Sequence, residues 1–173
     1  MAINQSILRN KAMSFNQTIY ESKQATASYK QRKSAFLCHS HKDEVLVKGL
    51  LALFDEIEID LYIDWKDHTM PDTPNVETAK KIQDKIISCD LFLFLATANS
   101  KESRWCPWEI GFGDSSKRSI YIIPTTDSYN TYGNEYLELY SRIDIGTYEK
   151  QDVYAIFEAG NRNARFLSTS NLR

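Results

Sequence analysis

The fold class is decided by the stretch DLFLFLAT, which spans residues 90–97. Five large apolar residues follow one another there, with an acid before them. A continuous apolar run of this length is typical of a strand that is buried on both faces, and such strands belong mainly to parallel sheets covered by helices. The stretch therefore predicts an α/β protein in which residues 90–97 form a central strand.

Strand-like and helix-like segments alternate on both sides of this central strand. The expected strands are 34–40, 60–65 and 119–126, and the expected helices are 42–57, 76–88 and a segment that begins near 103–106. This alternation predicts a flavodoxin-like parallel sheet of about five strands with helices on both faces. In the remaining segment we expect a helix that leads into an edge strand near Ile143–Ile145, and a last helix over residues 153–160.

The charge distribution suggests a division of the chain at residue 33. Residues 1–33 carry six Lys or Arg and one acid, whereas the other 140 residues carry fifteen Lys or Arg and twenty-two acids. The spacing of apolar residues predicts a basic amphipathic helix over residues 2–20, followed by a linker. Residues 34–173 are the expected main domain, and their acidic balance argues against nucleic acid as a partner. The helix should bury a stripe formed by Ile3, Ile7, Phe15 and Ile19.

The composition also bears on where the protein acts. No run of about 18 apolar residues is present, so we expect no membrane span. The first residues lack the continuous apolar stretch of a signal peptide, and the three cysteines form no CxxC pair. These features predict a cytoplasmic protein with reduced thiols.

Familiar cofactor and metal motifs are missing from the sequence. The GxG at residues 111–113 does not lie between a strand and a helix, and no Walker lysine loop is present. Cys38, His39 and His41 lack the spacing of a zinc site, and Cys38 cannot pair directly with His39 because neighbours in a strand point to opposite faces. We therefore expect no metal and no bound cofactor.

The segment SRWCPWE, residues 103–109, places a glutamate behind two tryptophans, a cysteine and a proline. Pro107 is tolerated in the first turn of a helix, and Trp105 and Glu109 would share a helix face because they are four residues apart. The segment follows the central strand, and ligands of such sheets bind beyond the carboxyl ends of the strands. From these residues alone, Glu109 is either a structural residue on a helix surface or a carboxylate prepared for chemistry.

From Ser34 to about Tyr148 the chain resembles the Toll/interleukin-1 receptor (TIR) domain family. The resemblance rests on AFLCHSHKDE (35–44), LYIDW (61–65), a Pro-containing loop (66–75) similar to the family's BB loop, and DLFLFLATANSKESRWCPWEIGFG (90–113). Its most specific part is the run Ser100…Ser103-x-Trp105-Cys106-x-x-Glu109. The resemblance leaves out the N-terminal segment and the C-terminal tail.

The resemblance implies an enzyme. In catalytic TIR proteins the glutamate of this motif is the key residue for cleaving NAD+ at the nicotinamide–ribose bond, so Glu109 is the expected catalytic residue. NAD+ is then a substrate rather than a cofactor. Asp64 is a candidate second carboxylate that strand alternation would turn away, and the loop 66–75 is expected to gate or complete the site. The residues expected to line the substrate site are Phe36, His39, Ser40, Trp65 and Trp105.

The resemblance also implies partners. A short stand-alone TIR protein is similar to those of the bacterial Thoeris anti-phage system, in which a TIR enzyme makes a diffusible NAD-derived nucleotide that activates a separate effector. Self-association with other TIR domains through the BB loop is expected as well. The group that accepts the ADP-ribosyl unit stays open between water, a group of the same molecule and a small amine. Two other classes of function also stay open: a non-catalytic scaffold and an effector directed at host TIR signalling.

Overall fold

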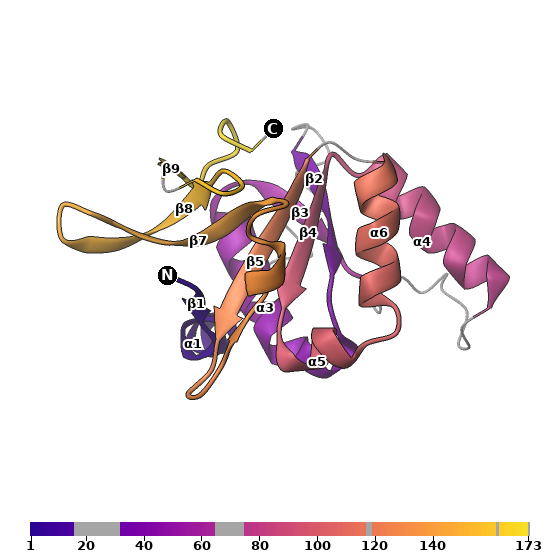
Figure 1. Ribbon diagram of the computed structural model, residues 1–173, viewed down its shortest axis with the longest axis horizontal. Helices are drawn as coiled ribbons and strands as arrows, with labels where there is room; N and C mark the ends of the chain where they lie inside the picture. The colour runs from indigo at the N-terminus through magenta and orange to yellow at the C-terminus, as the bar shows by residue number, and fades with distance from the viewer. Residues whose placement is uncertain (16–31, 65–74, 117–118, 162, 173) are drawn as a thin grey trace.

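A computed structural model describes residues 1–15, 32–64, 75–116, 119–161 and 163–172 of the chain (Figure 1). Its centre is a parallel sheet with the strand order β3-β2-β4-β5-β7, which is the predicted flavodoxin-like order. β4 is buried along its whole length, as its apolar run predicts. The strands are β2 (Lys33–Cys38), β3 (Ile59–Tyr62), β4 (Leu91–Ala96), β5 (Ile120–Thr126) and β7 (Ser141–Tyr148).

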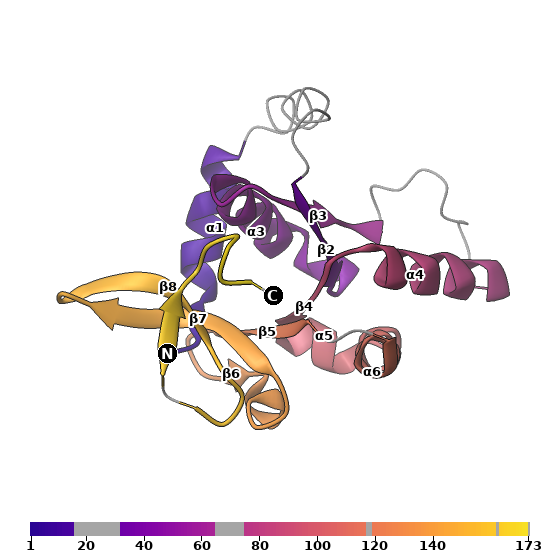
Figure 2. The same cartoon turned by 90° about the horizontal axis from the view of Figure 1, so that it is seen from above.

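Helices cover both faces of this sheet, which confirms the predicted layers (Figure 2). On one face α1 (Gln5–Ser14) and α3 (Glu44–Glu56) contribute to one hydrophobic core. On the other face α4 (Val76–Ser88) and α6 (Cys106–Ser116) contribute to a second core. None of the helices in the described parts of the chain is long and apolar enough to cross a membrane.

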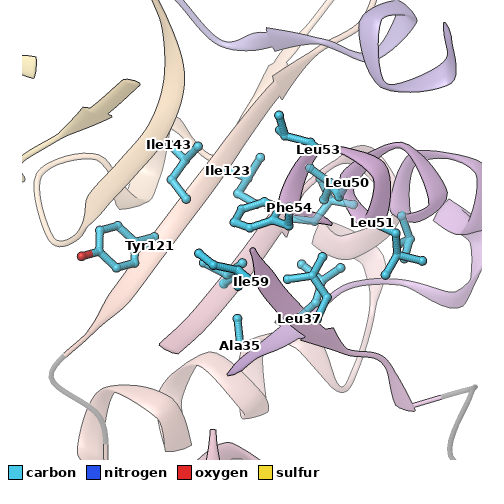
Figure 3. Close-up of a cluster of buried hydrophobic side chains, with 14 of the residues drawn as sticks. Ala35, Leu37, Leu50, Leu51, Leu53, Phe54, Ile59, Tyr121, Ile123 and Ile143 are labelled. Carbon is cyan, nitrogen blue, oxygen red and sulfur yellow. The ribbon is translucent and has the colours of Figure 1, made fainter. Parts of the chain in front are cut away.

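Alternation along β2 distributes its side chains between the two cores. Leu37 packs in the first core with Leu50 and Phe54 of α3 (Figure 3). Cys38 belongs to the second core, which also contains Cys106 at the start of α6. Because successive strand residues point to opposite faces, the last residue of β2 is directed towards α6.

The C-terminal part of the chain differs from the prediction. The segment expected to form a last helix is β8 (Gln151–Phe157), which pairs antiparallel with β7 and with β9 (Ala164–Phe166). β7 is therefore an interior strand rather than an edge strand. The β-branched and aromatic residues of β8 favour a strand, and Glu149 and Lys150, both with positive φ, form the two-residue turn of a hairpin. The helix expected before β7 is reduced to a 3-10 turn, η4 (Asn134–Tyr136).

The N-terminal segment packs on the main body. β1 (Ile3–Asn4) pairs in parallel with the end of β5, which also pairs with the short β6 (Thr131–Tyr132). The helix α1 is shorter than the predicted 2–20, and its fully buried residue is Leu8. The prediction that Ile7 is buried is wrong, because its side chain is 37% exposed. Of the other stripe residues, Ile3 is buried in β1, Phe15 packs against the core, and Ile19 lies outside the described residues.

The contact between α1 and α3 leaves no room for a side chain at Gly49. A Cβ atom built there would lie 2.1 Å from the carbonyl oxygen of Leu8. The glycine therefore allows the two helix backbones to approach, and this approach buries Leu8.

Candidate active site

Glu109 lies in the first turn of α6, close to the carboxyl end of β2. Just before α6 begins at Cys106, the hydroxyl oxygen of Ser103 accepts hydrogen bonds from the backbone N–H groups of Trp105 (3.2 Å) and Cys106 (3.3 Å). The N–H of Glu109 then donates to the carbonyl oxygen of Trp105 at 2.8 Å. The predicted helix start is confirmed, and it turns the Glu109 side chain inwards, where it is only 5% exposed.

Burial raises the pKa of Glu109 and so makes its carboxyl less acidic than usual. Loss of solvation raises the pKa of its carboxyl from 4.5 to about 8. The Cys38 thiol opposes this shift by donating a hydrogen bond, and His41 opposes it through its charge, whereas Cys106 and Asp64 raise the pKa further. A buried carboxyl with a strongly shifted pKa at the edge of a parallel sheet is typical of a functional site rather than of a solvated helix surface.

This shift predicts that Glu109→Gln stabilises the protein in a pH-dependent way. Because the folded-state pKa lies above the usual value, the stability linked to Glu109 is complete below about pH 4.5 and is lost as the pH rises towards about 8. The variant should therefore match the parent at pH 4 and exceed it at pH 8, on the order of a few kcal/mol at most. Urea unfolding at several pH values measures this difference. A difference that does not change with pH would contradict the burial of an ionisable Glu109.

Two histidines and Asp64 form a second part of the site beside Glu109. The Nδ1 of His39 donates to the carbonyl oxygen of Leu37 at 2.7 Å, and its Nε2 lies 3.6 Å from the Asp64 carboxylate. The Nε2 of His41 contacts the same carboxylate at 2.9 Å. Burial lowers the pKa of His39, whereas the hydrogen bond with Asp64 raises the pKa of the more exposed His41. Asp64 thus faces the site rather than turning away from it.

The structure brings together some of the predicted substrate-lining residues and separates others. His39 and Ser40 both lie at the end of β2, and the Ser40 hydroxyl accepts from the N–H of Lys42 at 3.4 Å. Trp105 is partly buried one turn before Glu109 and packs edge-on against Trp108, with 5.3 Å between ring centroids.

Phe36 is placed differently from the other candidates. It is 2% exposed and stacks in the second core between Tyr62 and Phe92, with ring centroids 5.8 and 5.6 Å away. It is thus packed in the core, two residues before the end of β2. Trp65 and residues 66–74 of the predicted BB loop lie outside the described residues.

Sequence reasoning did not identify the role of Asp43. Asp43 is 5% exposed, and its carboxylate accepts hydrogen bonds from the Thr97 hydroxyl and the Asn99 amide, both at 2.6 Å. These bonds join the turn after β2 to the turn after β4, at the point where the winding of the sheet reverses. Asp43 therefore fixes the geometry of the loop that carries His39 and His41. A single sequence holds no signal for this contact, because its partners are more than fifty residues away.

Two cavities open at the same edge of the sheet, on either side of α5 (Ala98–Glu102). One of about 110 Å³ is lined by Arg9, Lys42 and Asp127 among others, and one of about 100 Å³ by Lys101 and Tyr136 among others. Glu109 lines neither of them. We place the site at the ionisable cluster nevertheless, because chemistry depends on the charged groups that converge there. Within the described ranges, no group of three or more His, Cys, Asp or Glu side chains is arranged to hold a metal ion.

Comparison with known proteins agrees with the geometry. The TIR domain family matches residues 35–155. The chain is 35% identical over 133 residues to "Probable 3′ cyclic ADP-D-ribose synthase ThsB′" of Bacillus cereus (strain MSX-D12), covering 72% of this chain and 68% of that protein. It is also 25% identical over 95 residues to "Putative cyclic ADP-D-ribose synthase TIR2" of Cytobacillus dafuensis, covering 53% of this chain and 25% of that protein. The expected resemblance to ThsB-type TIR proteins is thereby confirmed, and the chain belongs to the TIR domain family.

Proposed function

We propose that this protein is an enzyme that cleaves the nicotinamide–ribose bond of NAD+ in the cytoplasm and converts the ADP-ribosyl part into a cyclic ADP-ribose signal. The observation that carries the proposal is Glu109: a buried carboxyl in the TIR glutamate motif, next to a second carboxylate at the carboxyl edge of the sheet. The names of the two relatives, both of them cyclic ADP-D-ribose synthases, support the choice of product class.

Glu109 supplies the electrostatic part of the reaction. When the nicotinamide–ribose bond breaks, its electron pair leaves with nicotinamide, and positive charge develops on the ribose. Nicotinamide departs as a neutral base, so no general acid is required. A carboxylate placed next to the ribose stabilises this charge strongly because its surroundings exclude water. The positive charge of the bound nicotinamide ring favours the ionised form of Glu109, which burial disfavours in the free protein.

The second step decides the product. A hydroxyl group of the same molecule attacks the ribose carbon, and the new bond closes the ring while the hydroxyl loses its proton. Asp64 is the proton acceptor in this proposal, because its carboxylate lies beside His41 and acts on Glu109 through its charge. Exclusion of water, to which the partly buried Trp105 contributes, favours ring closure over hydrolysis.

The product would act as a diffusible message. By similarity to the ThsB-type relative, we propose that it activates a separate effector during anti-phage defence, which requires no lasting contact between the two proteins.

Incubation of the purified protein with NAD+, followed by chromatographic separation and mass spectrometry, tests the proposed function. A cyclic product has the mass of ADP-ribose minus one water, and nicotinamide is released in equal amount. Release of nicotinamide with linear ADP-ribose alone would replace the cyclase by a hydrolase. If the protein consumes no NAD+ at any protein concentration, it is a non-catalytic scaffold rather than an enzyme.

We further propose that self-association with a second TIR domain completes the site. The prediction is that specific activity rises with protein concentration, because a dimer would carry the activity. Charge reversal at Asp67 or Asp72, which lie outside the described residues, should reduce it. Activity assays over a hundredfold range of concentration, with light scattering on the same samples, provide the measurement. If specific activity stayed constant over that range in the parent protein and in the charge-reversal variant, the proposal that self-association completes the site would be ruled out.

A further inference from the structure

The cavity between α1 and α5 has no part in the mechanism proposed above. Its volume is about 110 Å³, and both helices lie at the end of the sheet to which the arrows of β4 and β5 point (Figure 1). Cavities that take a whole drug-sized ligand measure about 300–1,000 Å³, so this one has room for a single chemical group. One wall is formed by Gln5 and Arg9 of α1, which precede the segment matched by the TIR family.

Two basic side chains line this cavity without an acidic partner. Arg9 comes from α1 and Lys42 from the turn η2 (His41–Asp43), and both residues are exposed. Within the described parts of the chain, neither of them forms an ion pair. Neighbouring cations on the same two helices are paired, since Lys11 of α1 bonds to Glu56 at 2.8 Å and Lys48 of α3 bonds to Glu44 at 2.6 Å.

The two acidic residues in the lining are already bound by protein donors. Both carboxylate oxygens of Asp43 accept a hydrogen bond from the turn after β4. One oxygen of Asp127 accepts from the N–H groups of Tyr129 (2.7 Å) and Asn130 (2.8 Å). Its other oxygen accepts from the Tyr132 hydroxyl at 2.6 Å. The negative charge of the lining is therefore satisfied within the protein, whereas its positive charge is not, so the group that completes the cavity is an anion.

The start of α3 favours a phosphate as this anion. Val45 and Leu46 line the cavity from the first turn of α3, and the Asp43 side chain does not cap this helix. The N-terminal end of a helix carries partial positive charge and commonly binds phosphate. Phosphate has enough oxygens to contact both a guanidinium and an ammonium that approach from separate segments. The cavity also lies where the winding of the sheet reverses, which is the usual place for ligands of such sheets.

We propose that this cavity is a phosphate-binding site in which Arg9 and Lys42 hold the anion. The same chemistry suits a phosphate of NAD+ and a free phosphate ion. Only the first of these sources rests on the proposed function. A short path joins the two sites, because His41, the residue before Lys42, contacts Asp64 at 2.9 Å.

Titration of the full-length ¹⁵N-labelled protein with inorganic phosphate, at constant ionic strength, tests the proposal. The backbone amide signals of Val45 and Asn99, which line the cavity, should shift with a saturating profile. Arg9→Gln and Lys42→Gln should each raise the Kd for phosphate about tenfold, because each removes a charged donor. Lys11→Gln is the matched control and should bind phosphate as the parent does, since Lys11 is paired with Glu56. Arg9→Lys, which keeps the charge, should recover part of the loss.

Three outcomes would overturn the proposal: no shift at the cavity, shifts spread evenly over the basic surface, or equal affinity in the parent and both glutamine variants. A second titration, with NAD+ and the Glu109→Gln variant, identifies the source of the phosphate. If NAD+ shifts the same amide signals and displaces inorganic phosphate, the site binds a phosphate of the substrate. If NAD+ leaves them in place, the site binds free phosphate. Full NAD+ consumption by Glu109→Gln would reject the proposed function, yet the inorganic phosphate titration would still decide the cavity.

Discussion

Glu109→Gln is expected to abolish NAD+ consumption while the protein remains folded. Glutamine keeps the size of the side chain and its capacity for hydrogen bonds, but it lacks the negative charge that stabilises the cationic ribose. The loss of one well-placed electrostatic stabiliser lowers the rate by about 10²–10³-fold, which is roughly 3–4 kcal/mol of transition-state stabilisation. The measurement is nicotinamide release under saturating NAD+, with circular dichroism to verify the fold.

Glu102→Gln provides the matched control for this substitution. Glu102 is an exposed glutamate at the end of α5, one loop before α6, and its replacement should leave the rate unchanged. Equal activity of Glu109→Gln and the parent protein would show that Glu109 is structural, and the protein would then be a scaffold. A similar loss in both variants would point to a general effect on folding rather than to catalysis.

Gly49→Ala is expected to produce a large loss of stability although the residue lies outside the site. The new methyl group would lie 2.1 Å from the carbonyl oxygen of Leu8, so the backbones of α1 and α3 must separate. Overpacking of this kind destabilises by about 1–3 kcal/mol, and exposure of Leu8 adds about 1.5–3 kcal/mol. Urea unfolding should therefore show a loss of about 3 kcal/mol or more. Hydrogen exchange should show that residues 3–14 have lost their protection.

Gly111→Ala separates this steric effect from the general effect of replacing a glycine. Gly111 lies inside α6, and a Cβ atom there would meet nothing within 4 Å. Alanine at that position should stabilise the helix by about 0.5–1 kcal/mol. If Gly49→Ala were as stable as the parent protein, the close contact between α1 and α3 would not exist in solution.

The parallel core could be predicted from the sequence because its signals are local. The apolar run of β4 and the helical spacing of α3 and α4 can each be recognised within a short segment of the sequence. The alternation of these strands and helices then predicts the sheet. The segment 153–157 carries no such unambiguous signal, since its β-branched and aromatic residues favour a strand but a run this short does not exclude a helix. Its state is decided by pairing with β7 and β9. The turn that connects β7 to β8, Glu149-Lys150, contains no glycine or asparagine, so the sequence gives no recognisable signal for a hairpin there.

The candidate site was predicted in its position but not in its internal contacts. Topology alone places Glu109 near the ends of the strands, because α6 follows the central strand. The approach of Cys38 and of Asp64 to Glu109 depends on how three distant segments meet in space, and no spacing in the sequence encodes it. The same holds for Phe36, whose aromatic ring suits a nicotinamide pocket and a hydrophobic core equally well, and which packs in the core.

The pairing of β1 with β5 has a consequence for synthesis on the ribosome. The ribosome makes Ile3 more than a hundred residues before its partner in the sheet, Thr125. At the usual rate of elongation this delay is on the order of ten seconds. The helix α1 can pack on α3 well before then, whereas β1 cannot pair until β5 has been made. β1 is thus made before α3 but reaches its native place after it, and a chaperone that binds β1 must stay bound until β5 has been made.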